Sequence, residues 1–269
     1  MQENTTRAIS GLVYVILLIT STLFSQMSFL ALFGFFLFIA IIEFCDLVQL
    51  KKTNSIAIGI ILFFLFSFFE VTISTKILLT IGSLYISLKL IYLLFSNKII
   101  KLDNISKYVY LIGYVILPII ILTKIPTNSF LFEPKIIISI FILIWTNDTF
   151  AYIVGKTIGK NKLFETISPK KTIEGFIGGV IFAIIVSVVL SKYYLNFSII
   201  NFIIIAIIIG VFGTIGDLIE SKFKRFANVK DSGTIMPGHG GILDRLDSAI
   251  FIAPFIYLFL QIFQYFTYA

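Results

Sequence analysis

Long apolar runs, separated by short polar connections, recur along the whole chain. Each run holds about 20 residues, which lets a helix cross a hydrocarbon layer of ~30 Å. In lipid such runs must be helical, because every backbone polar group needs a partner within the protein. The pattern predicts nine spans, near residues 9–25, 28–45, 55–71, 77–95, 107–123, 134–154, 174–192, 198–217 and 248–267.

Composition leads to the same fold class. The chain is 58% hydrophobic and 13% charged, with a mean hydropathy of +1.05. A soluble domain of 269 residues has more polar surface to cover than this composition supplies. We therefore expect an all-α polytopic membrane protein with a single integral membrane domain over residues 1–269. Its first five spans lie in residues 1–133 and the remaining four in residues 134–269.

Lysine and arginine are divided unequally between the two ends of these spans. Of the 21 such residues, four fall on one side, Lys89 lies within a span, and the other 16 fall on the side of the N-terminus. The four are Lys76, Lys124, Lys135 and Lys192. By the positive-inside rule, we expect the N-terminus in the cytoplasm and the C-terminus outside.

The net charge of +7 fits this distribution and favours anionic headgroups and phosphates as partners. The cations are spread over membrane loops rather than gathered on one soluble face, so we expect no nucleic-acid partner.

One long segment, residues 217–247, is too polar to face lipid. Asp217 ends the eighth predicted span, and Asp244 and Asp247 are three residues apart, on one face of the helix that enters the ninth. Carboxylates at two helix ends supply the hard oxygen ligands that Mg²⁺ prefers. The segment predicts a metal site with Asp217 and Asp244 as first candidates and Asp247 and Asp231 next. The alternative is a set of structural salt bridges with neighbouring cations.

The same segment holds candidates for phosphate binding. Glycines around Pro237 and His239 let the backbone take positive φ and approach a ligand closely. His239, the only histidine, is a candidate substrate or phosphate contact, with a general acid or a turn-organising role as alternatives. The candidates for phosphate neutralisation are Lys224, Arg225, Lys230 and Arg245.

A second polar segment covers residues 145–175. Asp148 lies in or just below a span, where an ionised carboxylate is costly unless it faces a polar cavity. Lys170 and Lys171 precede a helix start that Thr172 and Glu174 are suited to cap. Cations at a helix N-terminus suit a polyphosphate. A positive-inside loop with a helix cap explains the same residues equally well.

These segments resemble the signature of phosphatidate cytidylyltransferases, also called CDP-diacylglycerol synthases. The motifs are Ser221-x-x-Lys224-Arg225-x-x-x-x-Lys230-Asp231-x-Gly233-x-x-x-Pro237-Gly238-His239-Gly240-Gly241-x-x-Asp244-Arg245-x-Asp247, Trp145-x-x-Asp148-x-x-Ala151-Tyr152-x-x-Gly155 and Ser168-Pro169-Lys170-Lys171-Thr172-x-Glu174-Gly175. Together they span roughly the C-terminal half. The first five spans match only in hydropathy.

The resemblance implies that CTP and phosphatidate react to give CDP-diacylglycerol and pyrophosphate, assisted by one or two Mg²⁺ ions. The spans and the distribution of lysine and arginine predict a multi-pass protein of the cell membrane with a cytoplasmic active site. The richness in Ile, Phe, Lys and Asn favours a bacterial source. The resemblance makes a homodimer plausible. The residues then expected to bind substrate are Asp148, Ser168, Lys170, Lys171, Ser221, Gly240 and Gly241.

The chemistry of the residues fits this reaction. A lipid phosphate is already anionic near neutral pH, so positioning and charge neutralisation matter more than a strong general base. One alternative is a cytidylyltransferase that acts on another lipid phosphate. A different class, an ion-coupled transporter, would use Glu43, Glu70, Lys89 and Asp148, but it gives no reason for the glycine-rich segment.

Overall fold

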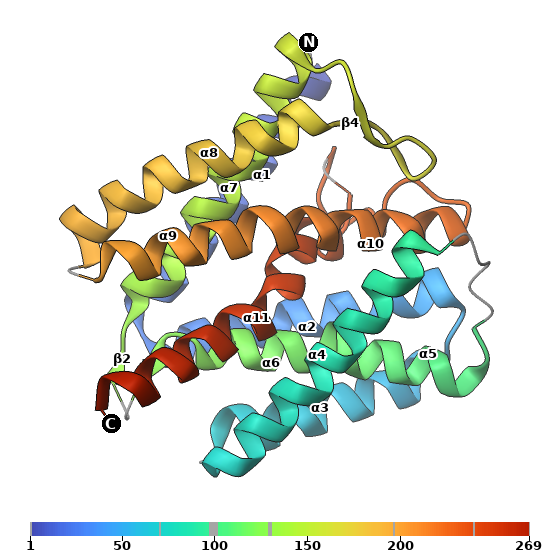
Figure 1. The fold of residues 1–269 in the computed structure, drawn as a ribbon. Coiled ribbons are helices and arrows are strands. Elements are labelled where there is room, and N and C mark those ends of the chain that lie inside the picture. Colours follow the sequence, from blue (N-terminus) through green and yellow to red (C-terminus); the bar gives the residue numbers. More distant parts are fainter. Residues whose placement is uncertain are drawn as a thin grey trace.

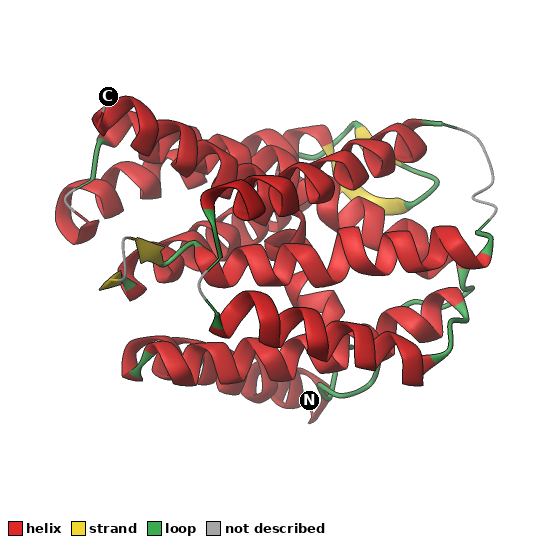
Figure 2. Ribbon diagram, turned by 90° about the horizontal axis from the view of Figure 1, so that it is seen from below, coloured by secondary structure: helices red, strands yellow, loops and turns green. Residues whose placement is uncertain are grey.

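The structure, a computed structural model, describes residues 2–69, 71–96, 102–128, 131–195, 197–238 and 240–268. Helices make up nearly all of it (Figures 1 and 2). The helices are α1 (Gln2–Phe24), α2 (Gln26–Val48), α3 (Lys52–Phe68), α4 (Ile73–Phe95), α5 (Asn104–Tyr110), α6 (Leu117–Lys124), α7 (Pro134–Ile158), α8 (Ile173–Leu190), α9 (Ile199–Ile208), α10 (Thr214–Phe226) and α11 (Leu243–Tyr268). Three π-helical turns, η1 (Leu111–Ile116), η2 (Ser191–Leu195) and η3 (Ile209–Gly213), join or extend some of them.

The predicted fold class is confirmed. Among the described residues, eight continuous helices are long and apolar enough to cross a membrane, and α3 adds a shorter apolar helix of 17 residues. Each of the nine predicted spans overlaps one of these helices. The chain is therefore an all-α polytopic membrane protein.

The eighth helix extends further than its hydropathy predicts. The apolar run ends at Asp217, but α9, η3 and α10 form one helical stretch over 199–226. The added turns are amphipathic, with Leu218, Ile219 and Phe223 buried on one face beside the buried Glu220, and with Arg225 exposed. Burial of that face keeps the polar end helical, so Asp217 lies within a helix rather than at its end.

The N-terminal and C-terminal halves share one apolar core. Phe44 of α2, Tyr114 of η1 and Phe223 of α10 are each almost fully buried. The ring centroids of Phe44 and Phe223 are 5.3 Å apart, and those of Tyr114 and Phe223 are 5.7 Å apart. This cluster fixes α10 against helices from the first half of the chain.

Helices α7 and α8 lie side by side along much of their length (Figure 1). Small residues allow this close approach, as they do in membrane helix pairs generally. A Cβ atom added at Gly175 would lie 2.6 Å from the carbonyl oxygen of Ala151, and one at Gly179 would lie 2.7 Å from that of Asn147. The pairing sets where Asp148, on α7, lies relative to the start of α8.

Two short hairpins complete the fold: β1 (Thr127–Asn128) with β2 (Leu131–Phe132), and β3 (Lys162–Phe164) with β4 (Ser168–Thr172). In the second, Lys162 pairs with Thr172. The predicted cap of α8 is confirmed, because the Thr172 hydroxyl accepts a hydrogen bond from the Gly175 N–H at 3.1 Å. Glu174 accepts hydrogen bonds from the N–H groups of Lys160 and Asn161. These contacts hold β4 at the end of the α7–α8 pair.

Candidate metal and phosphate site

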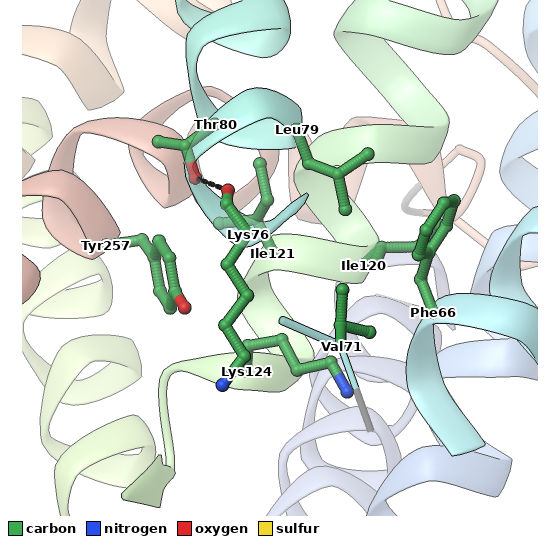
Figure 3. A pocket seen from close by; sticks show the side chains of 9 residues that line it. All are labelled: Phe66, Val71, Lys76, Leu79, Thr80, Ile120, Ile121, Lys124 and Tyr257. Atoms are coloured by element: carbon green, nitrogen blue, oxygen red, sulfur yellow. Dashed lines mark hydrogen bonds between the residues drawn. The ribbon is translucent and has the colours of Figure 1, made fainter. Parts of the chain in front are cut away.

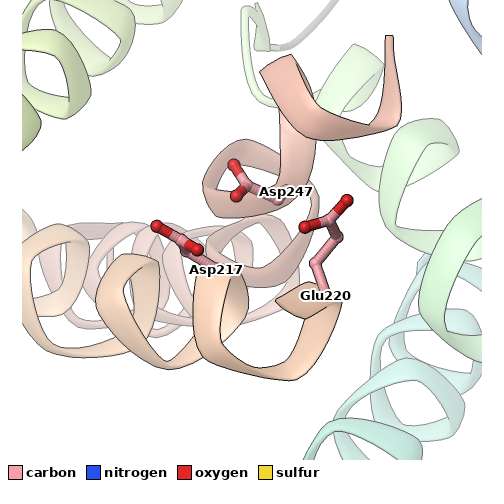
Figure 4. Close-up of side chains that lie close together, drawn as sticks. All are labelled: Asp217, Glu220 and Asp247. Carbon is pink, nitrogen blue, oxygen red and sulfur yellow. The ribbon is translucent and has the colours of Figure 1, made fainter. Parts of the chain in front are cut away.

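Three carboxylates gather where α10 crosses the first turns of α11 (Figure 4). One oxygen each from Asp217, Glu220 and Asp247 lie within 4.8 Å of one another. Asp217 is 18 residues after the start of α9. At 1.5 Å per residue that is roughly 27 Å, about the thickness of a hydrocarbon layer. The cluster therefore lies about one hydrocarbon thickness along this helical stretch from its start.

A glycine permits this meeting of helices. A Cβ atom at Gly216 would lie 2.5 Å from Cβ of Phe251 and 3.0 Å from the carbonyl oxygen of Asp247. Only hydrogen fits there, so α10 approaches α11 closely enough to bring Asp217 and Glu220 beside Asp247.

The two segments that the sequence singles out meet at Asp217. The ammonium group of Lys171, on β4, lies 2.5 Å from Oδ2 of Asp217. The Ser221 hydroxyl donates a hydrogen bond of 3.3 Å to Oδ1 of the same carboxylate. The charges of Lys171, Asp217 and Arg245 all act on Asp148, whose Oδ1 accepts a hydrogen bond of 3.2 Å from the Asn147 amide. Residues from α7, β4, α10 and α11 thus surround one polar region.

Lys224 connects the acidic cluster to a further carboxylate. Its ammonium group lies 2.5 Å from Oε2 of Glu220 and 2.6 Å from Oδ1 of Asp244. The three side chains are only 12%, 1% and 6% exposed, respectively. Such a buried arrangement needs charges of both signs, because an unpaired charge there would be costly.

Asp244 is already fully engaged by its own surroundings. Its Oδ2 accepts hydrogen bonds from the Gly241 N–H at 2.7 Å, the Ser232 N–H at 2.8 Å and the Ser232 hydroxyl at 2.9 Å. With Lys224 on its other oxygen, Asp244 organises the loop and orients a lysine. It does not belong to the three-carboxylate group that contains Asp247.

The loop before α11, residues 232–242, folds back over this region. Gly238 and Gly240 have φ angles of 75° and 85°, which L side chains rarely adopt. The Met236 N–H donates a hydrogen bond of 3.0 Å to the carbonyl oxygen of Gly240, which closes the turn. Helix α1 contacts the turn as well, since the Ser10 hydroxyl donates a bond of 3.0 Å to the carbonyl oxygen of Pro237.

A buried carboxylate from the first half of the chain holds the other side of this loop. Glu43 of α2 is 5% exposed. Its oxygens accept hydrogen bonds from the Leu243 N–H at 2.8 Å, the Ile242 N–H at 3.0 Å and the Ser232 hydroxyl at 3.0 Å. The polar network therefore joins α2, in the first half of the chain, to the start of α11.

The remaining candidate residues have varied surroundings. Lys170, Lys230 and Asp231 are exposed, and Arg225, also exposed, donates a hydrogen bond of 3.1 Å to the carbonyl oxygen of Val229. Arg245 is exposed too, while Ser168 begins β4. Gly241 contributes its N–H to Asp244. His239 lies outside the described residues, and its role stays a prediction.

Sequence reasoning did not select Glu220 or Ser232, and it named Glu43 only for the transporter alternative. A signal for Glu220 was present, because the three-residue spacing of Asp244 and Asp247 also separates Asp217 from Glu220. On a helix that spacing puts both side chains on one face. Glu43 and Ser232 carry no comparable signal, since their contacts depend on how distant helices pack.

The described cavities lie elsewhere. One is lined mainly by apolar side chains, together with Tyr257 and the half-buried Lys76 and Lys124 (Figure 3). Another lies between α2 and α3 and has only apolar residues around it, including Phe63 and Phe64. Neither includes a carboxylate, so neither competes with the acidic cluster as a site for metal chemistry.

The cluster fits a divalent cation by the nature of its donors. It offers three carboxylate oxygens, the hard ligands that Mg²⁺ prefers. Both oxygens of Glu220 are buried and accept no hydrogen bond from the described residues, while Oε2 forms an ion pair with the ammonium group of Lys224. Asp217, Glu220 and Asp247 are therefore the residues suited to hold the ion.

Comparison with known proteins agrees with this architecture. A sequence model described as the cytidylyltransferase family matches residues 5–263. This covers nearly the whole chain, and the protein belongs to the cytidylyltransferase family.

Several bacterial relatives are each named phosphatidate cytidylyltransferase. Those of Staphylococcus haemolyticus, Bacillus subtilis and Staphylococcus aureus are 51%, 48% and 49% identical over 121, 124 and 122 residues. The matched regions cover 45%, 46% and 45% of this chain and 46% of each relative. The chain therefore spans about half the length of the curated relatives it matches.

Proposed function

We propose that the protein is a phosphatidate cytidylyltransferase that converts CTP and phosphatidate into CDP-diacylglycerol and pyrophosphate. The observation that carries the proposal is the carboxylate cluster on α10 and α11, joined through Lys171 to the β4 segment. Membership of the cytidylyltransferase family and the names of the relatives support the nucleotide and the lipid.

In this reaction a phosphate oxygen of phosphatidate attacks the α-phosphorus of CTP. The bond from that phosphorus to the bridging oxygen of the β-phosphate breaks, and pyrophosphate leaves with the electron pair. The nucleophile is already an anion, so the protein must chiefly hold two mutually repelling groups in line.

The residues around the cluster suit that task. Lys171 and Lys224 each lie 2.5 Å from a carboxylate of the cluster, so both cations are at hand for phosphate oxygens. Asp217, Glu220 and Asp247 would hold Mg²⁺. When bound there, the ion would neutralise charge that develops on the transferring phosphates.

The position of the site suits one water-soluble and one lipid substrate. We propose that the cluster lies at the headgroup level, about one hydrocarbon thickness along its helix, where phosphatidate from the membrane and CTP from water can meet. We propose that this surface is cytoplasmic, because the connections on its side carry most of the lysines and arginines.

The test is incorporation of radiolabelled CTP into lipid by the purified protein, with phosphatidate and Mg²⁺ present. We expect CDP-diacylglycerol and pyrophosphate in equal amounts, and no product when phosphatidate or the metal is omitted. Absence of any product that depends on both CTP and phosphatidate would refute the proposal. If the protein formed a CDP-lipid faster from another lipid phosphate than from phosphatidate, the result would instead support a cytidylyltransferase that acts on that lipid.

The transporter hypothesis receives no support from the contacts of its candidate residues. Glu43 binds the loop before α11, and Asp148 lies in the polar region around Asp217. Glu70 lies outside the described residues.

A further inference from the structure

The start of α11 depends on a side chain from a distant helix. The first N–H groups of any helix lack partners within it. At α11 the N–H groups of Ile242 and Leu243 both point to Glu43, with hydrogen bonds of 3.0 and 2.8 Å. An anion at this position is favoured by the helix dipole as well. Glu43 therefore caps α11 from α2.

The loop is shaped around this carboxylate. A Cβ atom at Gly233 would lie 2.5 Å from Oε1 of Glu43, and one at Gly241 would overlap both Glu43 oxygens. Ser232 fills the remaining side, with its hydroxyl 3.0 Å from Glu43 and 2.9 Å from Asp244. Glycine at these two positions therefore leaves room for the Glu43 carboxylate.

The capped turn carries two groups of the proposed site. Asp244 is the second residue of α11 and holds Lys224, which in turn pairs with Glu220. Asp247 lies one turn further and belongs to the carboxylate cluster. A shift of the first turn of α11 would displace Asp247 and Lys224 together.

We propose that Glu43 is a positioning residue for the site: by capping α11 and holding the loop of residues 232–242, it sets where Asp247 and Lys224 lie. It touches neither substrate nor metal and acts only through the loop and the helix start. The catalytic part of this statement rests on the proposed function, whereas the structural part does not.

The test compares Glu43→Gln and Glu43→Ala with Ser83→Ala. In the glutamine variant an NH₂ group replaces one acceptor oxygen, so at least one N–H group at the helix start loses its partner. The alanine variant removes both acceptors. Ser83→Ala is the matched control, because it removes another buried hydrogen bond between distant segments, the 3.1 Å bond to the carbonyl oxygen of Gly113.

The first measurement is amide hydrogen exchange followed by mass spectrometry. We expect the amides of residues 232–247 to exchange faster in Glu43→Gln than in the wild-type protein, and faster again in Glu43→Ala. Exchange in the rest of the chain should change little. Ser83→Ala should leave that segment unchanged. Unaltered exchange of residues 232–247 in both Glu43 variants, or a uniform increase over the whole chain, would overturn the proposal.

The second measurement is the Mg²⁺ concentration that gives half-maximal CDP-lipid formation. We expect a rise of about tenfold or more in Glu43→Gln, which corresponds to about 1.4 kcal/mol, and less than twofold in Ser83→Ala. An unchanged Mg²⁺ requirement with lower protein stability would mean a purely structural role and would also overturn the proposal. If the wild-type protein forms no CDP-lipid, the proposed function fails, and the exchange measurement alone decides whether Glu43 positions the loop.

Discussion

Asp217 and Asp244 differ in burial and in hydrogen bonding, and we therefore assign them different roles in the site. Asp217 is about one third exposed and has one partner on each oxygen, Lys171 and Ser221, whereas Asp244 is nearly buried and accepts three hydrogen bonds on Oδ2 besides its ion pair with Lys224. An oxygen surrounded by N–H and O–H donors has little capacity left for a metal ion. Asp217 and Asp247, with Glu220, are the better ligands by this criterion.

This difference predicts contrasting effects of Asp217→Asn and Asp244→Asn. Asp244→Asn breaks a buried ion pair and sets an NH₂ group against donors, which should cost about 3–5 kcal/mol of stability. Asp217→Asn removes a partly exposed pair worth about 1 kcal/mol or less, but it should abolish Mg²⁺-dependent activity. The free energy of unfolding in detergent measures the loss of stability, and electron paramagnetic resonance of bound Mn²⁺ measures the loss of metal binding. Together the two measurements distinguish the variants. Full stability of Asp244→Asn with lost Mn²⁺ binding would restore Asp244 as a ligand.

For single residues, the sequence indicates which segments are polar better than it indicates which carboxylate holds a metal ion. The spacing of aspartates, lysines and glycines selects two polar segments that meet in the structure, where Lys171 and Ser221 contact Asp217. Which carboxylate binds a metal depends on the donors around it, and those donors come from remote positions such as Ser232. No local pattern contains that information.

Among the helices, the crossing of α10 and α11 controls the site. Gly216 lies at the contact, with Phe251 and Asp247 of α11 against it. In Figure 4 the two carboxylates of α10 face the carboxylate of α11 across this crossing. The separation of the helices should therefore set the geometry of the cluster.

Gly216→Ala tests this dependence. The new Cβ would meet Cβ of Phe251, which cannot rotate away, so the helices must separate at a cost of about 1–3 kcal/mol. We expect a higher Mg²⁺ requirement together with the loss of stability. Gly82→Ala is the control, because its Cβ would meet only Leu117 at 3.9 Å. If Gly216→Ala and Gly82→Ala had the same stability and the same Mg²⁺ requirement, the crossing of α10 and α11 would tolerate a side chain at residue 216.

Helix positions follow from hydropathy, whereas helix ends and contacts do not. All nine apolar runs are helical, because lipid permits little else for a spanning segment. The polar turns after Asp217 remain helical through burial of Phe223 against Phe44 and Tyr114. That burial is a property of the packed molecule, so the run of apolar residues ends before the helix does.

For the whole molecule, Glu43 shows that the two halves of the chain form a single unit. The functional motifs fall in the C-terminal half, yet the loop between them is held by α2 and touched by α1. The first five spans, whose sequence indicates only hydropathy, are thus part of the support of the site. A homodimer remains a prediction of the family resemblance.

Orientation in the membrane gives the last prediction. The distribution of lysine and arginine places the β3–β4 hairpin in the cytoplasm and the β1–β2 hairpin outside. With the buried Cys45 replaced by alanine, Thr166→Cys and Leu131→Cys each provide one exposed thiol, on opposite sides. An impermeant maleimide should label Leu131→Cys in intact cells and Thr166→Cys only after permeabilisation. The reverse result would place the carboxylate cluster on the outer surface, away from cellular CTP, and would contradict both the orientation and the proposed reaction.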